Sequence, residues 1–278
     1  MGVDRRAFLL ASLAAAAWPA RAQRQALDVP YVPTPQVVVD EMLRLARVTA
    51  DDYLMDLGSG DGRILITAAR KFGVQGHGVE LDDDLLAEST ENAARAGVAE
   101  RVQFRKEDLF QADLSVASVI TMYLVPRVNQ RLLPRLLELK PGTRLVSHDF
   151  DLGDWRPDVK TTIRKNIFLW IVPARVAGRW ETRLALPGGE RRLVLELRQQ
   201  HQDVDGIVHG GERITQLWQP VLEGERFRFT LIDDRDREAE ANLYVDARVQ
   251  GGVMTGRMQR GVGRAAIELP FHAVRVGS

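Results

Sequence analysis

Apolar and polar positions follow two different patterns along this chain. Between residues 36 and 150, short apolar runs alternate with segments whose apolar side chains recur every three or four positions. The first such segment, Gln36–Arg47, predicts a helix before the first strand. This alternation of helices and strands predicts an α/β fold, in which a mostly parallel sheet is covered by helices.

The elements of this first part are placed by their apolar runs and by the turns between them. Lys140-Pro141-Gly142 is a turn that leads into the fifth strand, and Pro157 begins a terminal hairpin. Further helices are predicted at Ile64–Arg70, at a segment that ends at Ala96, and at Asn129–Leu139. Strands are predicted at Tyr53–Met55, Val74–Val79, Thr143–His148, Val159–Ile163 and Ile167–Val172.

Past Pro173 the pattern changes to short alternating strands separated by glycine or charged turns, which predicts a small all-β barrel or sandwich. The Gly-x-Trp sequence at Gly178 and the Gly-x-Met-x-Gly turn at Gly252–Gly256 resemble calycins. This second domain either covers and stabilises the first or recognises a substrate or envelope partner. Its predicted strands are Gly178–Leu186, Arg192–Gln199, Val204–Val208, Glu212–Trp218, Arg226–Ile232, Ala241–Val249, Val253–Gln259 and Ala265–Val274.

The overall composition narrows the classes of function. A length of 278 residues fits one substantial domain and one small domain. The formal net charge is zero and no basic cluster is present, so nothing in the charge favours a nucleic acid partner. The five histidines lack ligand spacing and the chain has no cysteine, so we predict no metal site.

The sequence from Asp56 to Gly62 is the strongest candidate for a binding site. It reads Asp-Leu-Gly-Ser-Gly-Asp-Gly and lies between the first strand and the helix behind it. Glycines let the backbone turn sharply there and let a ligand approach closely. Glu80, at the end of the second strand, lies at the distance expected of a carboxylate that accepts hydrogen bonds from ribose hydroxyls. We predict a nucleoside cofactor site that includes Gly58, Ser59, Gly60 and Gly62.

The spacing of the glycines separates two kinds of cofactor. The dinucleotide fingerprint would place its third glycine at position 63, which is Arg63. The carboxylate of Asp56 would repel a pyrophosphate, whereas it tolerates the cationic methionyl part of S-adenosylmethionine. The motif therefore favours a methyl donor over NAD. Asp61 remains open between a helix cap and a cofactor contact.

These residues resemble the class I S-adenosylmethionine-dependent methyltransferases, which have a seven-stranded sheet. Within that class, the chain over residues 28–174 is similar to the FAM173-type protein-lysine methyltransferases. The matching segments are Tyr31-Val32-Pro33-Thr34-Pro35, Asp56 to Ile64, Tyr123-Leu124-Val125-Pro126, and Val146 to Phe150 followed by Trp155. The resemblance implies that Tyr31 and Thr34 close over the methionyl end of the cofactor. It also implies that Asp108, after the third strand, meets the adenine amino group.

The acceptor side of the site is predicted from aromatic residues. Tyr123 follows the fourth strand, and Phe150 and Trp155 follow the fifth, so these three could border a narrow channel for a lysine side chain. The alternative for these three aromatics is ordinary packing. The lysine acceptor rests on the resemblance, so a small-molecule N- or O-methyltransferase is the alternative enzyme. A non-catalytic envelope protein that binds a nucleoside or a partner is the alternative outside enzymes.

The first 22 residues have the features of an export signal. Asp4 to Leu10 matches the twin-arginine pattern, a short apolar stretch follows, and Ala20-Arg21-Ala22 is a small-x-small cleavage site. We therefore expect a periplasmic protein with a signal at residues 1–22, a methyltransferase domain at 28–174 and an all-β domain at 175–278. The segment is too short for a stable membrane span. Export raises the question of cofactor supply, because S-adenosylmethionine is made in the cytoplasm.

Overall fold

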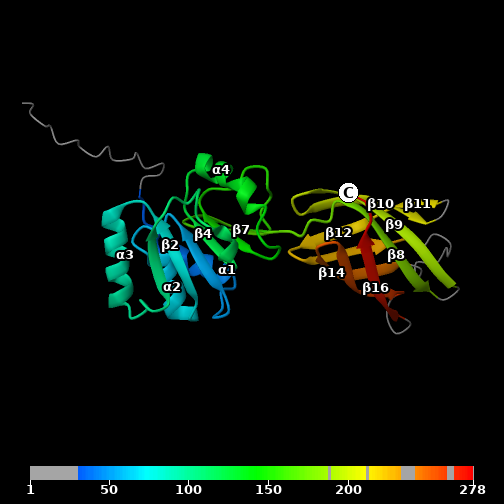
Figure 1. Cartoon of the computed structure of the whole chain (residues 1–278), viewed down its shortest axis with the longest axis horizontal. Helices are drawn as coiled ribbons and strands as arrows, with labels where there is room; N and C mark the ends of the chain where they lie inside the picture. Colours follow the sequence, from blue (N-terminus) through cyan, green and yellow to red (C-terminus); the bar gives the residue numbers. More distant parts are fainter. Residues whose placement is uncertain (1–30, 187–188, 211–212, 233–241, 262–265, 278) are drawn as a thin grey trace, which may run out of the picture.

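The computed structural model describes residues 31–186, 189–210, 213–232, 242–261 and 266–277. These form two bodies that lie side by side, each built around its own sheet (Figure 1). The first sheet ends at Ile171 and the second begins at Gly178. The predicted export signal lies outside the described residues. In the described part of the chain, no helix is long and apolar enough to cross a membrane.

The first body is a seven-stranded sheet with the strand order β3-β2-β1-β4-β5-β7-β6. Strands β1 to β5 pair in parallel, and β7 runs antiparallel between β5 and β6. This arrangement confirms the predicted class I methyltransferase sheet. The strands are β1 (Tyr53–Leu57), β2 (Gln75–Glu80), β3 (Val102–Lys106), β4 (Val119–Met122), β5 (Arg144–His148), β6 (Val159–Ile163) and β7 (Lys165–Ile171).

Helices cover both faces of this sheet, because successive strand residues point to opposite sides. Leu54 of β1 belongs to a buried cluster with residues of the first three helices, whereas Met55 belongs to a cluster with residues of the fourth. The helix at Asn129 was predicted three residues too late, since a proline at the first helical position favours an earlier start. The helices are α1 (Gln36–Leu45), α2 (Arg63–Phe72), α3 (Asp83–Arg95), the 3₁₀ turn η1 (Leu114–Val116) and α4 (Pro126–Leu136).

The second body is a nine-stranded antiparallel sheet with the order β11-β10-β9-β8-β16-β15-β14-β13-β12. The N–H of Leu217 donates to the carbonyl of Gly206 (2.9 Å), so the segment between the two end strands meets β10 and the sheet closes on itself. The strands are β8 (Gly178–Leu186), β9 (Gly189–Gln200), β10 (Asp203–Gly210), β11 (Arg213–Gln216), β12 (Trp218–Glu223), β13 (Arg226–Leu231), β14 (Leu243–Gln250), β15 (Val253–Arg260) and β16 (Ile267–Arg275).

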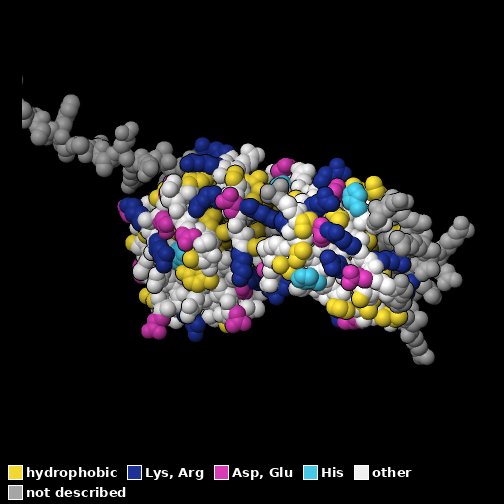
Figure 2. Space-filling model, turned by 45° about the vertical axis from the view of Figure 1, so that its right-hand side comes forward, with side chains coloured by type: hydrophobic (Ala, Val, Ile, Leu, Met, Phe, Trp, Pro, Cys, Tyr) yellow, Lys and Arg dark blue, Asp and Glu magenta, His cyan; other side chains and the backbone are white. Residues whose placement is uncertain are grey.

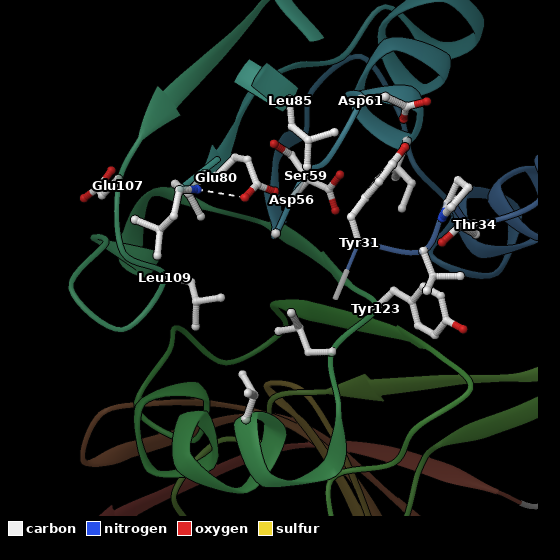
Figure 3. A pocket seen from close by; sticks show the side chains of 18 of the residues that line it. Tyr31, Thr34, Asp56, Ser59, Asp61, Glu80, Leu85, Glu107, Leu109 and Tyr123 are labelled. Carbon is white, nitrogen blue, oxygen red and sulfur yellow. Dashed lines mark hydrogen bonds between the residues drawn. The ribbon is translucent and has the colours of Figure 1, made fainter. Parts of the chain in front are cut away.

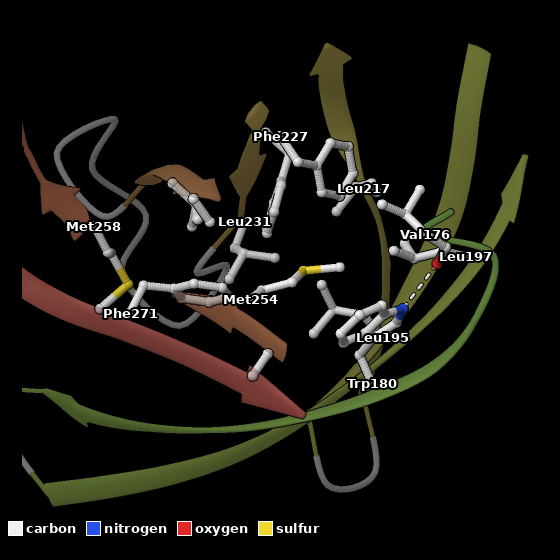
Figure 4. Close-up of a cluster of buried hydrophobic side chains, with 14 of the residues drawn as sticks. Val176, Trp180, Leu195, Leu197, Leu217, Phe227, Leu231, Met254, Met258 and Phe271 are labelled. Atoms are coloured by element: carbon white, nitrogen blue, oxygen red, sulfur yellow. Dashed lines mark hydrogen bonds between the residues drawn. The ribbon is translucent and has the colours of Figure 1, made fainter. Parts of the chain in front are cut away.

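The closed sheet confirms the barrel alternative of the prediction, with one difference in its strands. The predicted strand Glu212–Trp218 is divided at buried Leu217 into β11 and the start of β12, so the described residues form nine strands and not eight. The predicted ends at Glu212, Ala241 and Ala265 lie outside the described residues. Figure 4 shows that large side chains from different strands, such as Trp180 of β8 and Met254 of β15, fill the interior.

Candidate cofactor and acceptor site

The glycine-rich turn after β1 has the backbone conformation that its sequence predicts. Gly58, Gly60 and Gly62 all have positive φ angles (72°, 53° and 81°), which side chains with a Cβ rarely adopt. A Cβ on Gly60 would also lie 2.3 Å from the ring of Tyr31. Gly62 is the N-cap of α2, so the turn ends at the positive end of a helix. Of these three glycines only Gly58 lines the cavity, since Gly60 is covered by Tyr31 and a Cβ on Gly62 would lie 2.5 Å from the ring of Phe104. The predicted contacts of Gly60 and Gly62 with the cofactor are therefore corrected, because the packing of the turn requires these two glycines.

Glu80 lies directly beside this turn, although it is twenty residues away in the chain. Its Oε2 accepts from the N–H of Gly60 (3.0 Å), and its Oε1 accepts from the N–H groups of Leu81 (2.8 Å) and Asp82 (3.1 Å). Three backbone donors thus fix the carboxylate at the edge of the cavity in Figure 3. This is the position predicted for a group that binds ribose hydroxyls.

Asp56 is buried beneath the same turn. Its Oδ1 accepts a hydrogen bond from the hydroxyl of Thr121 (2.7 Å). Burial raises the pKa of the Asp56 carboxyl to about 7, and the negative charges of Glu80 and Asp61 add to the increase, against the hydrogen bond from Thr121. A buried carboxylate at this place favours a ligand that brings positive charge.

Asp108 and its neighbours lie at the opposite end of the cavity. Strand β3 ends at Lys106, so Asp108 stands in the turn after the strand, where its Oδ1 accepts from the N–H of Phe110 (2.9 Å). Asp108 and Glu107 both line the cavity, whereas Lys106 forms an exposed ion pair with Asp83 (2.7 Å). The turn thus supplies two carboxylates to the cavity, those of Glu107 and Asp108, whereas only Asp108 was predicted to contact the adenine.

The cavity between these acids has a volume of about 320 Å³. Asp56, Ser59, Glu80 and Asp108 all line it, which brings together side chains from the ends of β1, β2 and β3 and from the turns after them. Figure 3 shows the first three of these side chains. The hydroxyl of Ser59 is buried and has no hydrogen-bond partner among the described residues. The cavity fits a cofactor with a ribose, an adenine and a cationic chain.

The segment that begins at Tyr31 forms one wall of this cavity. We call residues 31–35 the strap. The ring of Tyr31 packs on Gly60, and its hydroxyl bonds Asp61. The guanidinium of Arg63 binds the Asp61 carboxylate (2.6 Å) and donates to the carbonyl of Thr34 (3.0 Å). Arg63 and Asp61 therefore hold the strap in place. The sequence analysis gave Arg63 no role, because this contact spans 29 residues.

The acceptor side is built around Tyr123, which lines the cavity at the end of β4. Its ring lies 4.0 Å from the ring of His148 and 6.1 Å from that of Phe150, with which it is stacked. The Nδ1 of His148 is 3.2 Å from the hydroxyl of Thr34, so the strap contacts this aromatic group. The described residues offer no hydrogen-bond partner to the buried Nε2 of His148, and burial lowers the pKa of its imidazole.

Trp155 is not part of this aromatic group. Its side chain is fully buried in the junction of the two bodies, where it packs against Trp170 and donates to Gln202 of the barrel (2.9 Å). The predicted role of Trp155 as a wall of the acceptor channel is therefore corrected, because the indole does not line the cavity. Phe150 does not line the cavity either, and it reaches the site only by stacking on Tyr123, so its predicted role as a channel wall is corrected to support of Tyr123.

Known proteins that are similar to this chain show its family. The model of the ANTKMT methyltransferase domain matches residues 56–159. A protein-lysine N-methyltransferase of Saccharolobus islandicus (strain REY15A) is 50% identical over 131 residues, which are 46% of this chain and 81% of that protein. The chain belongs to the ANTKMT methyltransferase-domain family. The resemblance to FAM173-type methyltransferases is thus confirmed, and so is S-adenosylmethionine as the cofactor of this methyltransferase.

Two further relatives of this methyltransferase differ in the acceptor that their names give. The adenine nucleotide translocase lysine N-methyltransferase of Mus musculus is 37% identical over 133 residues, which are 47% of this chain and 57% of that protein. A solved structure of an RNA methyltransferase from Salinibacter ruber, in complex with S-adenosyl-L-homocysteine, is 53% identical. It has a TM-score of 0.51 and covers 52% of this chain and 96% of its own. The matches therefore cover about half of this chain.

Proposed function

We propose that this enzyme transfers a methyl group from S-adenosylmethionine to the side-chain amine of a protein lysine. The observation that carries the proposal is the 50% identity to a protein-lysine N-methyltransferase over the part of the chain that holds the cavity. The geometry of the acceptor side supports it. Tyr123 and the half-buried Phe150 offer aromatic surface to a flexible alkyl chain with a cationic end.

The residues of the cavity have distinct roles in this reaction. Glu80 and Asp108 would hold the two ends of the adenosine, and Asp56 would face its cationic part. When bound, S-adenosylmethionine supplies a methyl group on a positively charged sulfur. The chain positions the acceptor and excludes water, and the amine must arrive without its proton. His148 is buried with a lowered pKa, so it is neutral at pH 7 and adds no positive charge beside the acceptor.

RNA is the second candidate acceptor, because the relative from Salinibacter ruber carries that description. The formal net charge of this chain is zero, so electrostatics do not favour RNA as the acceptor. The two acceptors can be compared directly. We would incubate the full chain with S-adenosylmethionine labelled in its methyl group and with poly-L-lysine, adenine nucleotide translocase or total RNA. Methyllysine in the acid hydrolysate would support the proposal, and label in RNA nucleosides alone would overturn it.

A matched pair of variants makes this assay specific. Glu80→Ala removes a carboxylate that lines the cavity and should abolish the methylation of every acceptor. Tyr123→Phe keeps the ring and should lower the rate without loss of cofactor binding, because Tyr123 borders the cavity on the acceptor side. If Tyr123→Phe lowers turnover only on small amines and leaves the protein acceptor unaffected, the small-molecule alternative is favoured.

We further propose that the enzyme is exported to the periplasm by its twin-arginine segment. The support is the sequence Asp4-Arg5-Arg6-Ala7-Phe8-Leu9-Leu10 and the cleavage site before Gln23. When the full chain is expressed in a bacterium with a twin-arginine pathway, the protein recovered from the periplasm should lack residues 1–22. Replacing both Arg5 and Arg6 with lysine should keep it in the cytoplasm, and unchanged fractionation would contradict export by this route.

A further inference from the structure

The hairpin turn between β9 and β10 of the barrel is inserted against the methyltransferase body. The turn consists of His201 and Gln202. It packs on the segment that follows β5, residues 149–156, which we call the acceptor loop because it carries Phe150. Gln202 is only 7% exposed although it stands in a hairpin turn, where polar side chains normally face solvent. This burial shows that the turn is a contact between the two bodies.

One amide side chain makes two polar contacts of this turn with the acceptor loop, beside the contact of His201 Nε2 with Asp154 Oδ1 (3.7 Å). The Oε1 of Gln202 accepts from the indole N–H of Trp155 (2.9 Å), and its Nε2 donates to the carbonyl of Arg156 (2.6 Å). The ring of His201 stacks on the same indole, with ring centroids 5.5 Å apart. Because these groups are buried, removing one partner would leave the other unsatisfied.

The turn itself is held in a strained conformation. His201 has a φ angle of 53°, which is unusual for a residue with a Cβ. The side chain of Gln199 fixes it, since its Nε2 donates to the carbonyls of His201 (2.7 Å) and Ala174 (2.9 Å). The barrel therefore presents Gln202 from a rigid turn that is also tied to the link between the two bodies.

The far end of the acceptor loop is held on the methyltransferase side. Asp149 has a φ angle of 67°, so the loop begins with a strained residue. The hydroxyl of Ser147 donates to the carbonyl of Phe150 (2.6 Å), and Asn129 donates to that of Asp151 (3.0 Å). The ring of Phe150 is then stacked against Tyr123. The acceptor loop thus connects the aromatic residues of the acceptor side with the residues that Gln202 of the barrel contacts.

We propose that Gln202 of the barrel is a positioning residue for the methyl acceptor. It fixes the Trp155–Arg156 end of the acceptor loop and so sets the place of Phe150 beside Tyr123. The inference deepens the proposed function and rests on it for the identity of the acceptor. It gives the barrel a role in turnover without any contact between the barrel and the cofactor.

The test compares Gln202→Ala with Asp203→Asn in the full chain. Asp203 is the next residue and its ion pair with Arg156 is exposed, with both side chains more than half accessible. Removing that pair should change little. In Gln202→Ala, the amide protons of residues 149–156 should exchange faster, and kcat/KM for poly-L-lysine should fall on the order of tenfold to a hundredfold. The affinity for S-adenosylmethionine should change by less than about twofold.

Trp155→Phe is the second variant, and it carries the same test should Gln202→Ala not fold. It keeps an aromatic ring and removes the indole N–H donor. The double variant should be no more impaired than the worse single variant, because both variants remove the hydrogen bond between Trp155 and Gln202. Unchanged exchange in the acceptor loop, or an equal loss of cofactor affinity, would overturn the inference. Failure of the wild-type enzyme to methylate any lysine would instead overturn the proposed function.

Discussion

Asp56 and Glu80 are both carboxylates of one cavity, yet their surroundings differ. Glu80 accepts from three backbone N–H groups, whereas Asp56 is buried with the hydroxyl of Thr121 as its partner. Hydrogen bonds therefore offset less of the cost of burying the Asp56 carboxylate. The pKa of this carboxyl is about 7, so it is protonated below that pH. A cationic ligand would favour the ionised form of Asp56.

We predict that the affinity for S-adenosylmethionine rises between about pH 6 and about pH 8. Below its pKa Asp56 is neutral, and above it the carboxylate attracts the cation, so affinity should increase about tenfold. The pKa is raised above its unfolded value, so folding stability attributable to Asp56 falls as the pH rises toward 7. Calorimetric titration at both pH values measures the affinity. Asp56→Asn should show a smaller dependence, and an identical one would contradict the assignment.

The glycine turn gives a second prediction at the same scale. Gly60→Ala should weaken cofactor binding at least about tenfold, because the new Cβ is strained at positive φ and collides with Tyr31. Gly153→Ala is the matched control. Gly153 also has a positive φ angle (74°), but a Cβ there meets nothing within 4 Å. Titration of both variants separates strain from collision, and equal affinities would show that Tyr31 does not pack on the turn in solution.

Among the elements, the strap is the segment whose role depends most on a single partner. Arg63 binds the Asp61 carboxylate with two nitrogens and the carbonyl of Thr34 with a third. Lysine cannot reproduce that fork. The strap forms a wall of the cavity. The contacts by which Arg63 holds the strap should therefore control how fast the cofactor dissociates.

We therefore expect Arg63→Lys to release S-adenosylmethionine about tenfold faster than the wild-type chain, with a smaller change in the association rate. Stopped-flow displacement measures the dissociation rate. Arg105→Lys serves as the control, since Arg105 is exposed and, among the described residues, its guanidinium bonds only Gln103 at 3.4 Å. A dissociation rate in Arg63→Lys equal to that of the control would show that the strap is held by other contacts.

The sequence predicted elements better than it predicted contacts between distant elements. Period and turn chemistry placed five of the seven strands of the first sheet. Asp56 and Glu80 were found from their places at strand ends, whereas Asp108 came from the family resemblance. The roles of Arg63 and Trp155 were not found. Their partners lie 29 and 47 residues away, so no local pattern reports them. The division of β11 from β12 was missed because Leu217 continues the alternation of buried side chains.

On the scale of the whole molecule, the barrel has a core of its own. Phe227 is fully buried beside Phe229, with ring centroids 4.8 Å apart, and Trp180 and Met254 fill neighbouring positions (Figure 4). On the surface, the two bodies carry interspersed positive and negative side chains (Figure 2). This core allows the barrel to present a rigid turn to the methyltransferase body.

Phe227→Ala should lower the free energy of unfolding by about 3–5 kcal/mol, because it removes a large buried side chain and leaves a cavity. Trp218→Ala, in the paired strand β12, should change it by no more than about 0.5 kcal/mol, since Trp218 is 51% exposed. Urea denaturation measures both values. If the barrel holds the acceptor loop, Phe227→Ala should also reduce lysine methylation at urea concentrations where cofactor binding persists. Similar losses of stability in the two variants would contradict the assigned core.

The meeting of β10 and β12 has a consequence for recognition. An open antiparallel sheet can capture an extended peptide by adding it as another strand. Here the seam is bridged at Leu217, and the two end strands beside it, β11 and β12, are only four and six residues long, so little main chain is open to such pairing. A protein substrate that binds the barrel must therefore be recognised by side chains on the outer wall of the barrel. Other extended peptides in the cell have little main chain there with which to pair.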